Sequence, residues 1–338
     1  MAGSYRLLLK DHVPLLSRNG RNILTRLLMN PSPNLSLTRS SLTPSATVFG
    51  RPCSNVANAK PLDFPISQNP PHQSHKVSDN LTSTPVSSLK VTELAKFSAI
   101  AETWWDAEGP FKPLHVMNPT RLAFIRSTLC RHFSKDPNSP KPLEGLKIVD
   151  VGCGGGILSE PLARMGATVT AIDAVEKNII IARLHADLDP VTSAIEYQCT
   201  TAEKLVEEQR KFDVVVSLEV IEHVSDPAQF CQSLASLTVP GGATLISTIN
   251  RSMRAYATAI VAAEYVLQWL PKGTHQWSSF LTPEELVLIL QRSSISIQEM
   301  AGFLYNPLTG RWYLSDDIGV NFIAYGTKNH EEIVESTI

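Results

Sequence analysis

The chain has 338 residues, of which 43% are hydrophobic, so it is long and apolar enough for one large or two ordinary domains with a sizeable core. Its formal net charge of −2 leaves no basic excess to neutralise a phosphate backbone, and a nucleic-acid partner is therefore not expected. The five cysteines are spread singly without a C-x-x-C pair, which disfavours a zinc site and a disulfide framework. Since no run of eighteen apolar residues occurs, we expect any membrane contact to be peripheral.

The two ends of the chain differ in composition from its middle. Residues 1–52 are rich in arginine and serine and contain a single acid, Asp11, which is typical of a transit peptide and favours the mitochondrion over the plastid. A tail with no addressing role is the alternative. Residues 53–88 are rich in Pro, Ser, Asn and His and have few large apolar side chains, so a disordered linker is expected there. The folded domain is predicted to span 89–330, followed by a short tail at 331–338.

The folded region is predicted to begin with two helices. Thr92 is positioned to cap the first, and the second is expected to follow Pro119. Beyond Pro142 apolar strands alternate with helices, and Thr282-Pro283 marks one further helix start. Strands are expected at 147–151, 168–172, 195–199, 214–218, 243–248, 296–300 and 321–325, with helices near 157–165, 176–186 and 227–237. This alternation predicts an α/β fold with a doubly wound (Rossmann-like) sheet of about seven strands, the last antiparallel, preceded by helices and carrying an insertion after the fifth strand.

A glycine-rich segment lies between the first strand and its helix. Its sequence is Asp150-Val-Gly152-Cys-Gly154-Gly-Gly156, and glycines at such a turn let the backbone approach a ligand closely. A dinucleotide motif G-x-G-x-x-G beginning at Gly152 would require glycine where the chain has Ile157, so a nicotinamide oxidoreductase is disfavoured. The D-x-G-x-G-x-G form instead resembles the first motif of class I S-adenosylmethionine-dependent methyltransferases. A tight turn that binds no ligand is the plain alternative.

Two acids after the next strands extend this candidate cofactor site. Asp173 ends the second strand, where a carboxylate can accept hydrogen bonds from ribose hydroxyls, although nicotinamide enzymes also carry an acid there. Glu203 follows the third strand, where related enzymes contact the adenine of the cofactor. Glu203 is equally typical of an acid in the first turn of a helix, and the sequence leaves both interpretations open.

The fourth strand is followed by the motif E-x-x-E-H, formed by Glu219, Glu222 and His223. If the chain turns helical here, the three side chains fall on one side of a helical turn. Two carboxylates and one imidazole suit a divalent cation such as Mg²⁺ with open positions for substrate oxygens. The alternative is an acid that faces the cofactor beside a structural histidine, with no metal.

From Glu93 onward the chain resembles the ubiquinone-biosynthesis O-methyltransferases, which are mitochondrial enzymes and bacterial counterparts that methylate polyprenylated catechols. The resemblance covers nearly the whole region after the linker and is more specific than the glycine loop, which many unrelated enzymes share. The matching segments are 97–105, 108–115, 118–122, 150–156, 219–223, 263–267, 271–275 and 305–307.

This resemblance implies roles for individual residues. Arg121 would bind the carboxylate of the cofactor, for which a planar bidentate cation is suited. Leu218 would contact the cofactor through its backbone at the end of the fourth strand. The other cofactor-binding positions would be Asp150, Gly152 and Gly154 of the loop, Asp173 and Glu203. The catalytic set would be Glu219, Glu222 and His223, acting as Mg²⁺ ligands.

The implied reaction is O-methylation of 3,4-dihydroxy-5-polyprenylbenzoate and demethylubiquinol with S-adenosylmethionine as the methyl donor. A phenol with a pKa of about 10 is mostly protonated at neutral pH and is a poor nucleophile. Mg²⁺ bound to both catechol oxygens would lower that pKa and orient one oxygen toward the methyl group. The sequence assigns no separate general base.

The insertion at about 250–280 bears on the location of the protein. It carries apolar and aromatic residues such as Tyr256, Leu267 and Trp269, flanked by Arg251 and Lys272, and could lie in a membrane interface or pack in the core. The resemblance favours the membrane, because those substrates carry polyprenyl tails. The expected location is peripheral, on the matrix side of the mitochondrial inner membrane, in a complex with other ubiquinone-biosynthesis proteins.

Two other functions stay open at the level of sequence. The first is an O-methyltransferase for another small phenolic acceptor. The second is a non-catalytic lipid-binding scaffold of a biosynthetic complex, although such a scaffold has no need to retain Arg121, Gly152, Asp173 and the E-x-x-E-H motif together.

Overall fold

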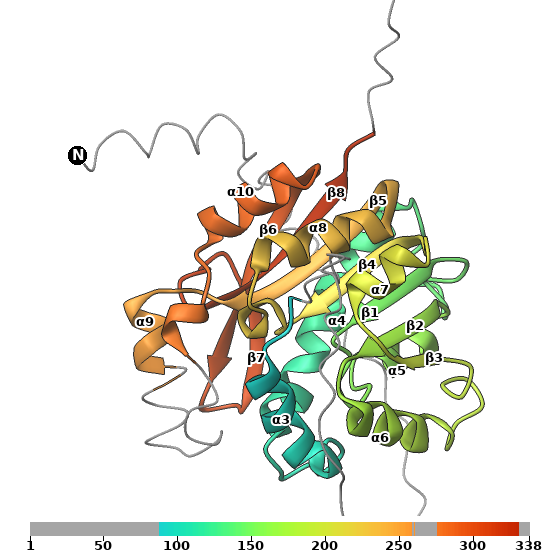
Figure 1. Ribbon diagram of the computed structural model, residues 1–338, viewed down its shortest axis with the longest axis horizontal. Coiled ribbons are helices and arrows are strands. Elements are labelled where there is room, and N and C mark those ends of the chain that lie inside the picture. The colour runs from blue at the N-terminus through green and yellow to red at the C-terminus, as the bar shows by residue number, and fades with distance from the viewer. Residues whose placement is uncertain (1–87, 259, 261–275, 331–338) are drawn as a thin grey trace, which may run out of the picture. The chain divides into compact units, whose positions relative to one another are not determined.

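The computed structural model describes residues 88–258, 260 and 276–330 (Figure 1). The predicted transit peptide, the predicted linker except Ser88 and the C-terminal tail at 331–338 lie outside the described residues. So do residues 259 and 261–275 of the predicted insertion, and with them Leu267, Trp269 and Lys272.

The described region is built on one eight-stranded sheet with the order β3-β2-β1-β4-β5-β8-β6-β7 (Figure 1). β1 to β5 pair in parallel, β8 pairs antiparallel with both β5 and β6, and β7 pairs antiparallel with β6. The predicted α/β fold with a doubly wound sheet is therefore confirmed, including the antiparallel last strand. The strands are β1 (Lys147–Val151), β2 (Thr168–Asp173), β3 (Glu196–Cys199), β4 (Phe212–Leu218), β5 (Thr238–Ile249), β6 (Ile295–Asn306), β7 (Arg311–Ser315) and β8 (Asn321–Lys328).

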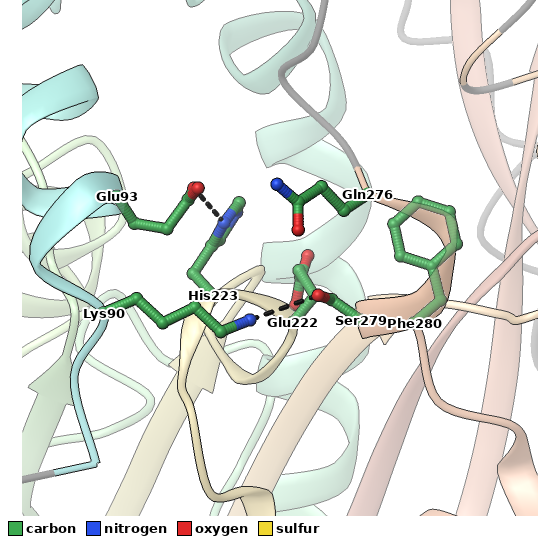
Figure 2. Close-up of a pocket in the computed structure, with 7 residues that line it drawn as sticks. All are labelled: Lys90, Glu93, Glu222, His223, Gln276, Ser279 and Phe280. Carbon is green, nitrogen blue, oxygen red and sulfur yellow. Dashed lines mark hydrogen bonds and ion pairs between the residues drawn. The ribbon is translucent and has the colours of Figure 1, made fainter.

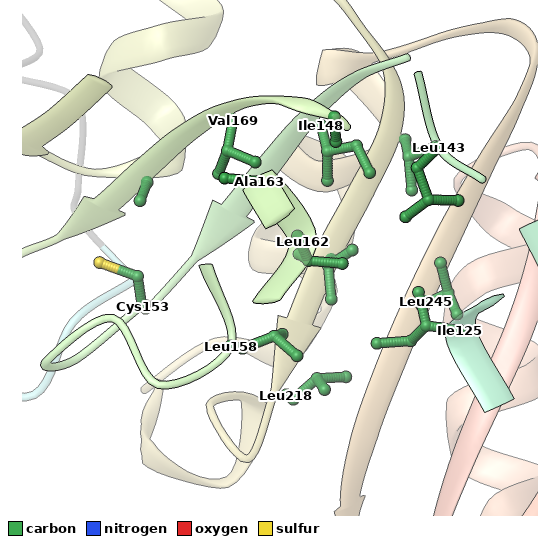
Figure 3. Close-up of a cluster of buried hydrophobic side chains, with 14 of the residues drawn as sticks. Ile125, Leu143, Ile148, Cys153, Leu158, Leu162, Ala163, Val169, Leu218 and Leu245 are labelled. Carbon is green, nitrogen blue, oxygen red and sulfur yellow. The ribbon is translucent and has the colours of Figure 1, made fainter. Parts of the chain in front are cut away.

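Helices cover both faces of the sheet, because successive strand residues point in opposite directions. Ile148 of β1 belongs to a cluster with α4, α5 and α6, whereas its neighbour Val149 packs with α7, α8 and α10. Figure 3 shows part of the first cluster, with Leu162 of α5 between Ile148 and Leu218. The helices are α3 (Val91–Ile100), η1 (Ala101–Thr103), α4 (Lys112–His132), α5 (Ser159–Arg164), α6 (Glu176–Ala186), α7 (Ala202–Glu207), η2 (Ile221–His223), α8 (Pro227–Leu237), α9 (Met253–Ala255), η4 (Trp277–Ser279) and α10 (Pro283–Arg292).

Two predicted helix starts are wrong. α3 begins at Val91 with Lys90 as its N-cap residue, so Thr92 lies inside the helix and does not cap it. α4 begins at Lys112 and contains Pro119, which is exposed; the proline at its first turn is Pro113. The rule that proline marks a helix start holds for α4, but it applies to Pro113.

The start of α10 follows the sequence prediction. Thr282 accepts a hydrogen bond from the backbone nitrogen of Glu285, whose side chain in turn accepts from the backbone nitrogen of Thr282. This capping box satisfies backbone donors that the first turn of a helix leaves without partners. None of the helices in the described ranges is long and apolar enough to cross a membrane.

Candidate functional site

The predicted cofactor residues gather at one edge of the sheet. β1, β2 and β4 are neighbouring parallel strands, so their carboxyl ends meet at the same edge. The glycine loop follows β1, Asp173 ends β2 and Leu218 ends β4. The structure therefore brings these residues together as expected from the order of the motifs.

The glycine loop makes a tight turn against β2. The backbone nitrogens of Gly152 and Cys153 both donate to the carbonyl oxygen of Ile172, at 2.8 and 2.9 Å. Gly152 has a φ of +78°, and a Cβ atom there would lie 2.4 Å from a methyl carbon of Val220. Only glycine combines that backbone conformation with so close an approach.

Asp173 is bound to the loop through its carboxylate. Its oxygens accept hydrogen bonds from the backbone nitrogen of Gly154 (2.9 Å), the backbone nitrogen of Val175 (2.8 Å) and the side-chain amide of Asn178 (3.1 Å). Asn178 also accepts from the indole nitrogen of Trp104 at 2.9 Å. Burial raises the pKa of Asp173, while these hydrogen bonds oppose the shift. Its position fits the predicted ribose-binding role, which stays a prediction.

Asp150 lies in β1, just before the first glycines of the loop. It is 2% exposed, and it accepts a 2.6 Å hydrogen bond from the hydroxyl of Ser159 at the start of α5. Burial raises the pKa of Asp150 to about 6, although the hydrogen bond and the charge of Arg121 act in the opposite direction. Its carboxyl group is thus held next to the loop and close to a cation.

Arg121 lies on α4 and is 4% exposed. Its Nη2 atom is 3.3 Å from a carboxylate oxygen of Glu219. Within the described part of the chain, its Nε and Nη2 atoms are buried without a hydrogen-bond acceptor. A guanidinium group in this state has unsatisfied donors, which are costly to bury, and a ligand carboxylate would satisfy them.

Glu219 turns the chain out of β4. It has a φ of +57°, which is uncommon for a residue with a side chain. Its carboxylate accepts a 2.7 Å hydrogen bond from the hydroxyl of Ser247 on the neighbouring strand β5 and also contacts Arg121. The turn therefore directs Glu219 toward the sheet edge and the Arg121 guanidinium.

Glu222 and His223 lie one step further along, in η2. Glu222 is 4% exposed and accepts a 2.9 Å hydrogen bond from Thr248; burial and the charge of Glu219 raise its pKa to about 7. The Nδ1 atom of His223 is 3.0 Å from a carboxylate oxygen of Glu93 on α3. Burial opposes the charged form of His223, but the Glu93 hydrogen bond and the nearby carboxylates raise its pKa overall.

The E-x-x-E-H side chains do not share one side of a helical turn, and that prediction is wrong. Only Glu222 and His223 are in η2, because the left-handed conformation of Glu219 separates it from the turn. Each side chain has its own protein partners, as described above. Among the described residues no group of three or more His, Cys, Asp and Glu side chains is arranged to hold a metal ion. Their donor types still match the ligands that Mg²⁺ prefers.

A pocket beside these residues is formed by three segments far apart in the chain (Figure 2). Glu222 and His223 of the predicted set line it, whereas Glu219 does not. The sequence patterns did not identify the other lining residues, since none belongs to a recognisable motif. These are Lys90 and Glu93 around the start of α3, and Gln276, Ser279 and Phe280 at η4.

Glu203 lies in the first turn of α7 and accepts a 2.5 Å hydrogen bond from the hydroxyl of Ser88. Glu203 is therefore an acid in the first turn of a helix, which is one of the two interpretations that the sequence left open. Its predicted contact with adenine stays a prediction. The four cysteines in the described ranges, Cys130, Cys153, Cys199 and Cys231, form no disulfide.

Comparison with known proteins identifies related sequences. Residues 122–294 match the family model described as a methyltransferase domain. The mitochondrial ubiquinone biosynthesis O-methyltransferase of Arabidopsis thaliana is 75% identical over 244 residues, which cover 72% of this chain and 76% of that protein. The ubiquinone biosynthesis O-methyltransferase of Methylobacterium nodulans is 49% identical over 70% of this chain and 94% of that protein. That of Dinoroseobacter shibae is 48% identical over 71% and 96%.

Proposed function

Since the chain belongs to the ubiquinone-biosynthesis O-methyltransferases, we propose that it methylates polyprenylated catechols with S-adenosylmethionine. The proposed acceptors are 3,4-dihydroxy-5-polyprenylbenzoate and demethylubiquinol. The relatives with this name support the pathway, and we place the acceptor beside Glu222 and His223, which line the pocket of Figure 2.

The observation that carries the cofactor assignment is the buried guanidinium of Arg121: among the described residues its Nε atom has no acceptor, and its Nη2 atom has the 3.3 Å ion pair with Glu219 but no hydrogen bond. A methionine carboxylate would supply the missing acceptor. Asp173, at the end of β2 and bound to Gly154, would accept from the ribose hydroxyls. The remaining proposed contacts come from Asp150, Gly152, Gly154, Glu203 and Leu218.

We propose that Glu219, Glu222 and His223 hold Mg²⁺, because their oxygen and nitrogen donors suit this ion. Arg121 and Ser247 both contact the Oε1 atom of Glu219, so its Oε2 atom would be the one to face the ion. The ion, when bound, would lower the pKa of a catechol hydroxyl.

In the proposed reaction, a catechol oxygen forms a new bond to the methyl carbon as the methyl–sulfur bond breaks, and the hydroxyl proton is released. The residues of this chain would position the two reactants. Arg121 would fix the amino-acid end of the cofactor, while α3 and η4 would hold the acceptor ring beside Glu222 and His223. Placing the reacting atoms in line lowers the entropic cost of the transfer.

We further propose a peripheral location on the matrix side of the mitochondrial inner membrane, with other ubiquinone-biosynthesis proteins as partners. The mitochondrial name of the Arabidopsis relative supports the organelle. The membrane contact is tested by flotation with liposomes: a variant with charged residues at Leu267 and Trp269 should no longer float with them. Unchanged flotation would contradict that contact.

The test of function is transfer of a labelled methyl group from S-adenosylmethionine to prenylated dihydroxybenzoate, with a short soluble catechol as the second acceptor. We expect transfer to the prenylated acceptor, loss of activity in chelator and recovery with added Mg²⁺. Equal use of both acceptors would point to another phenolic substrate, and cofactor binding without any transfer would point to a scaffold. Turnover that chelator leaves unchanged would refute the metal role.

A further inference from the structure

Lys90 is a cation in the acceptor pocket that belongs to none of the predicted sets of functional residues. It is the N-cap residue of α3, and its Nζ atom donates a 3.1 Å hydrogen bond to the hydroxyl of Ser279 in η4. Within residues 88–258, 260 and 276–330 it forms no ion pair, although the acids Glu93 and Glu222 line the same pocket. Its charge is therefore available to a ligand.

Glu93 has two cationic partners other than Lys90. The two carboxylate oxygens of Glu93 contact Lys96 at 2.9 Å and His223 at 3.0 Å. Glu222 accepts its hydrogen bond from Thr248. Lys90 is therefore not needed to balance the charge of Glu93.

The pocket is chemically two-sided. Figure 2 shows Glu93 and His223 together on one side, with Gln276, Ser279 and Phe280 of the segment at η4 on the other, and Lys90 extending from α3 toward Ser279. A cation next to hydroxyl and amide groups offers the donors that a carboxylate requires. Phe280 is 1% exposed and packs with Ile249 and Ala255, so it anchors η4 in the core.

The two proposed acceptors differ at this point. The benzoate carries a carboxylate on its ring, whereas the quinol carries no charged group. We propose that Lys90, with Ser279, binds the carboxylate of the benzoate acceptor and so determines the preference for the anionic over the neutral substrate. This inference rests on the proposed function, because it names the recognition element for one of its two substrates.

The test compares Lys90→Met with the wild type on both acceptors, which should carry identical prenyl tails. Methionine removes the charge and keeps much of the length of the apolar stem. Loss of one charge-assisted hydrogen bond should raise KM for the benzoate by about tenfold or more. KM for the quinol should stay within about twofold, because no carboxylate contact is lost. Lys90→Arg, which keeps the charge, should retain most of the preference for the benzoate.

A second comparison uses the wild-type protein and does not depend on how the variant folds. The benzoate and its uncharged carboxamide analogue should differ in kcat/KM in the wild type, and the difference should largely disappear in Ser279→Ala and Lys90→Met. An equal loss for benzoate and quinol in Lys90→Met would show that Lys90 only fastens η4 to α3, and would overturn the inference. Equal use of benzoate and carboxamide by the wild type would also overturn it. Failure of the proposed function has a different signature, namely wild-type protein that methylates neither acceptor.

Discussion

Asp150 illustrates how a residue of the predicted cofactor site can destabilise the fold around it. Burial raises its pKa to about 6, above the ordinary value of 3.8, so the folded protein disfavours the ionised carboxylate. An acid with a raised pKa in the folded state contributes its full stability below the unfolded pKa and loses it as the pH rises through the folded pKa. At neutral pH the ligand-free protein therefore carries a buried charge that weakens the fold.

Asp150→Asn tests this cost. Two pKa units correspond to about 3 kcal/mol, so the variant should be more stable than the wild type by up to about that amount at pH 7.5. The gain should vanish near pH 4, where both side chains are neutral. Urea unfolding of the ligand-free proteins at pH 4.5, 6 and 7.5 measures the difference. A difference that does not change with pH would contradict the assignment.

Gly152 and Gly145 form a matched pair for testing the glycine loop. Both have left-handed backbone, with φ of +78° and +82°, but only at Gly152 would a Cβ atom meet a neighbour, 2.4 Å from Val220. Alanine at either position should cost about 1–2 kcal/mol for the backbone conformation. Gly152→Ala should cost more than Gly145→Ala and should also weaken binding of S-adenosylhomocysteine.

Thermal unfolding and titration calorimetry of the two variants provide the measurement. Equal losses of stability, with cofactor affinity unchanged in both, would mean that the close approach of Gly152 to Val220 affects neither stability nor cofactor binding.

At the residue scale, sequence identified the loop better than the motif after β4. The glycine spacing and the position of Asp173 at the end of a strand can both be recognised from neighbouring residues alone. In the structure the backbone nitrogen of Gly154 donates to Asp173. The E-x-x-E-H geometry depended on a helical turn from Glu219 onward. Glu219 instead adopts left-handed backbone and bonds to Ser247 on another strand, a tertiary contact that residue spacing does not encode.

At the element scale, α10 combines a predictable local signal with a role in the pocket. Its capping box joins Thr282 to Glu285, and the segment just before it contains Ser279 and Phe280 of the pocket. Thr282→Ala should lower the free energy of unfolding by about 1 kcal/mol, since it removes an acceptor for a helix N–H group.

Thr282→Ser is the control for this change, because serine keeps the capping oxygen, and it should stay close to the wild type. Chemical unfolding of the three proteins decides the matter. A serine variant as unstable as the alanine variant would assign the effect to the lost methyl group.

Two other elements show why local rules failed. α4 contains two prolines, Pro113 at its first turn and Pro119 inside it, and only the first position is favourable for proline. Pro119 is exposed and packing by α4 residues such as Phe124 and Leu129 holds the helix together. β7 was not predicted, because an edge strand of five residues buries little of its surface and lacks a continuous apolar pattern.

At the scale of the whole molecule, the pocket depends on a segment that precedes the matched methyltransferase domain. That match begins at residue 122, whereas Lys90 and Glu93 line the pocket from α3. The segment is fixed to the loop after β4, since Leu89 pairs with Val224 and the backbone nitrogen of Ser225 donates to Ser88 at 2.5 Å. The first described segment and η4 thus meet at the motif that follows β4.

Two truncations separate the roles of the N-terminal regions. Removal of residues 1–86 should leave the thermal midpoint and methyl transfer unchanged, because Lys90 is the first of the described residues that line the pocket. Removal of residues 1–100 deletes Lys90, Glu93 and the contacts to Val224 and Ser225, and should abolish acceptor methylation while cofactor binding is reduced less. Activity assays, calorimetry with S-adenosylhomocysteine and thermal unfolding of both proteins measure these effects. Retained methylation after the longer truncation would show that α3 is dispensable for the acceptor site, and loss of folding after the shorter one would place the start of the domain upstream of residue 87.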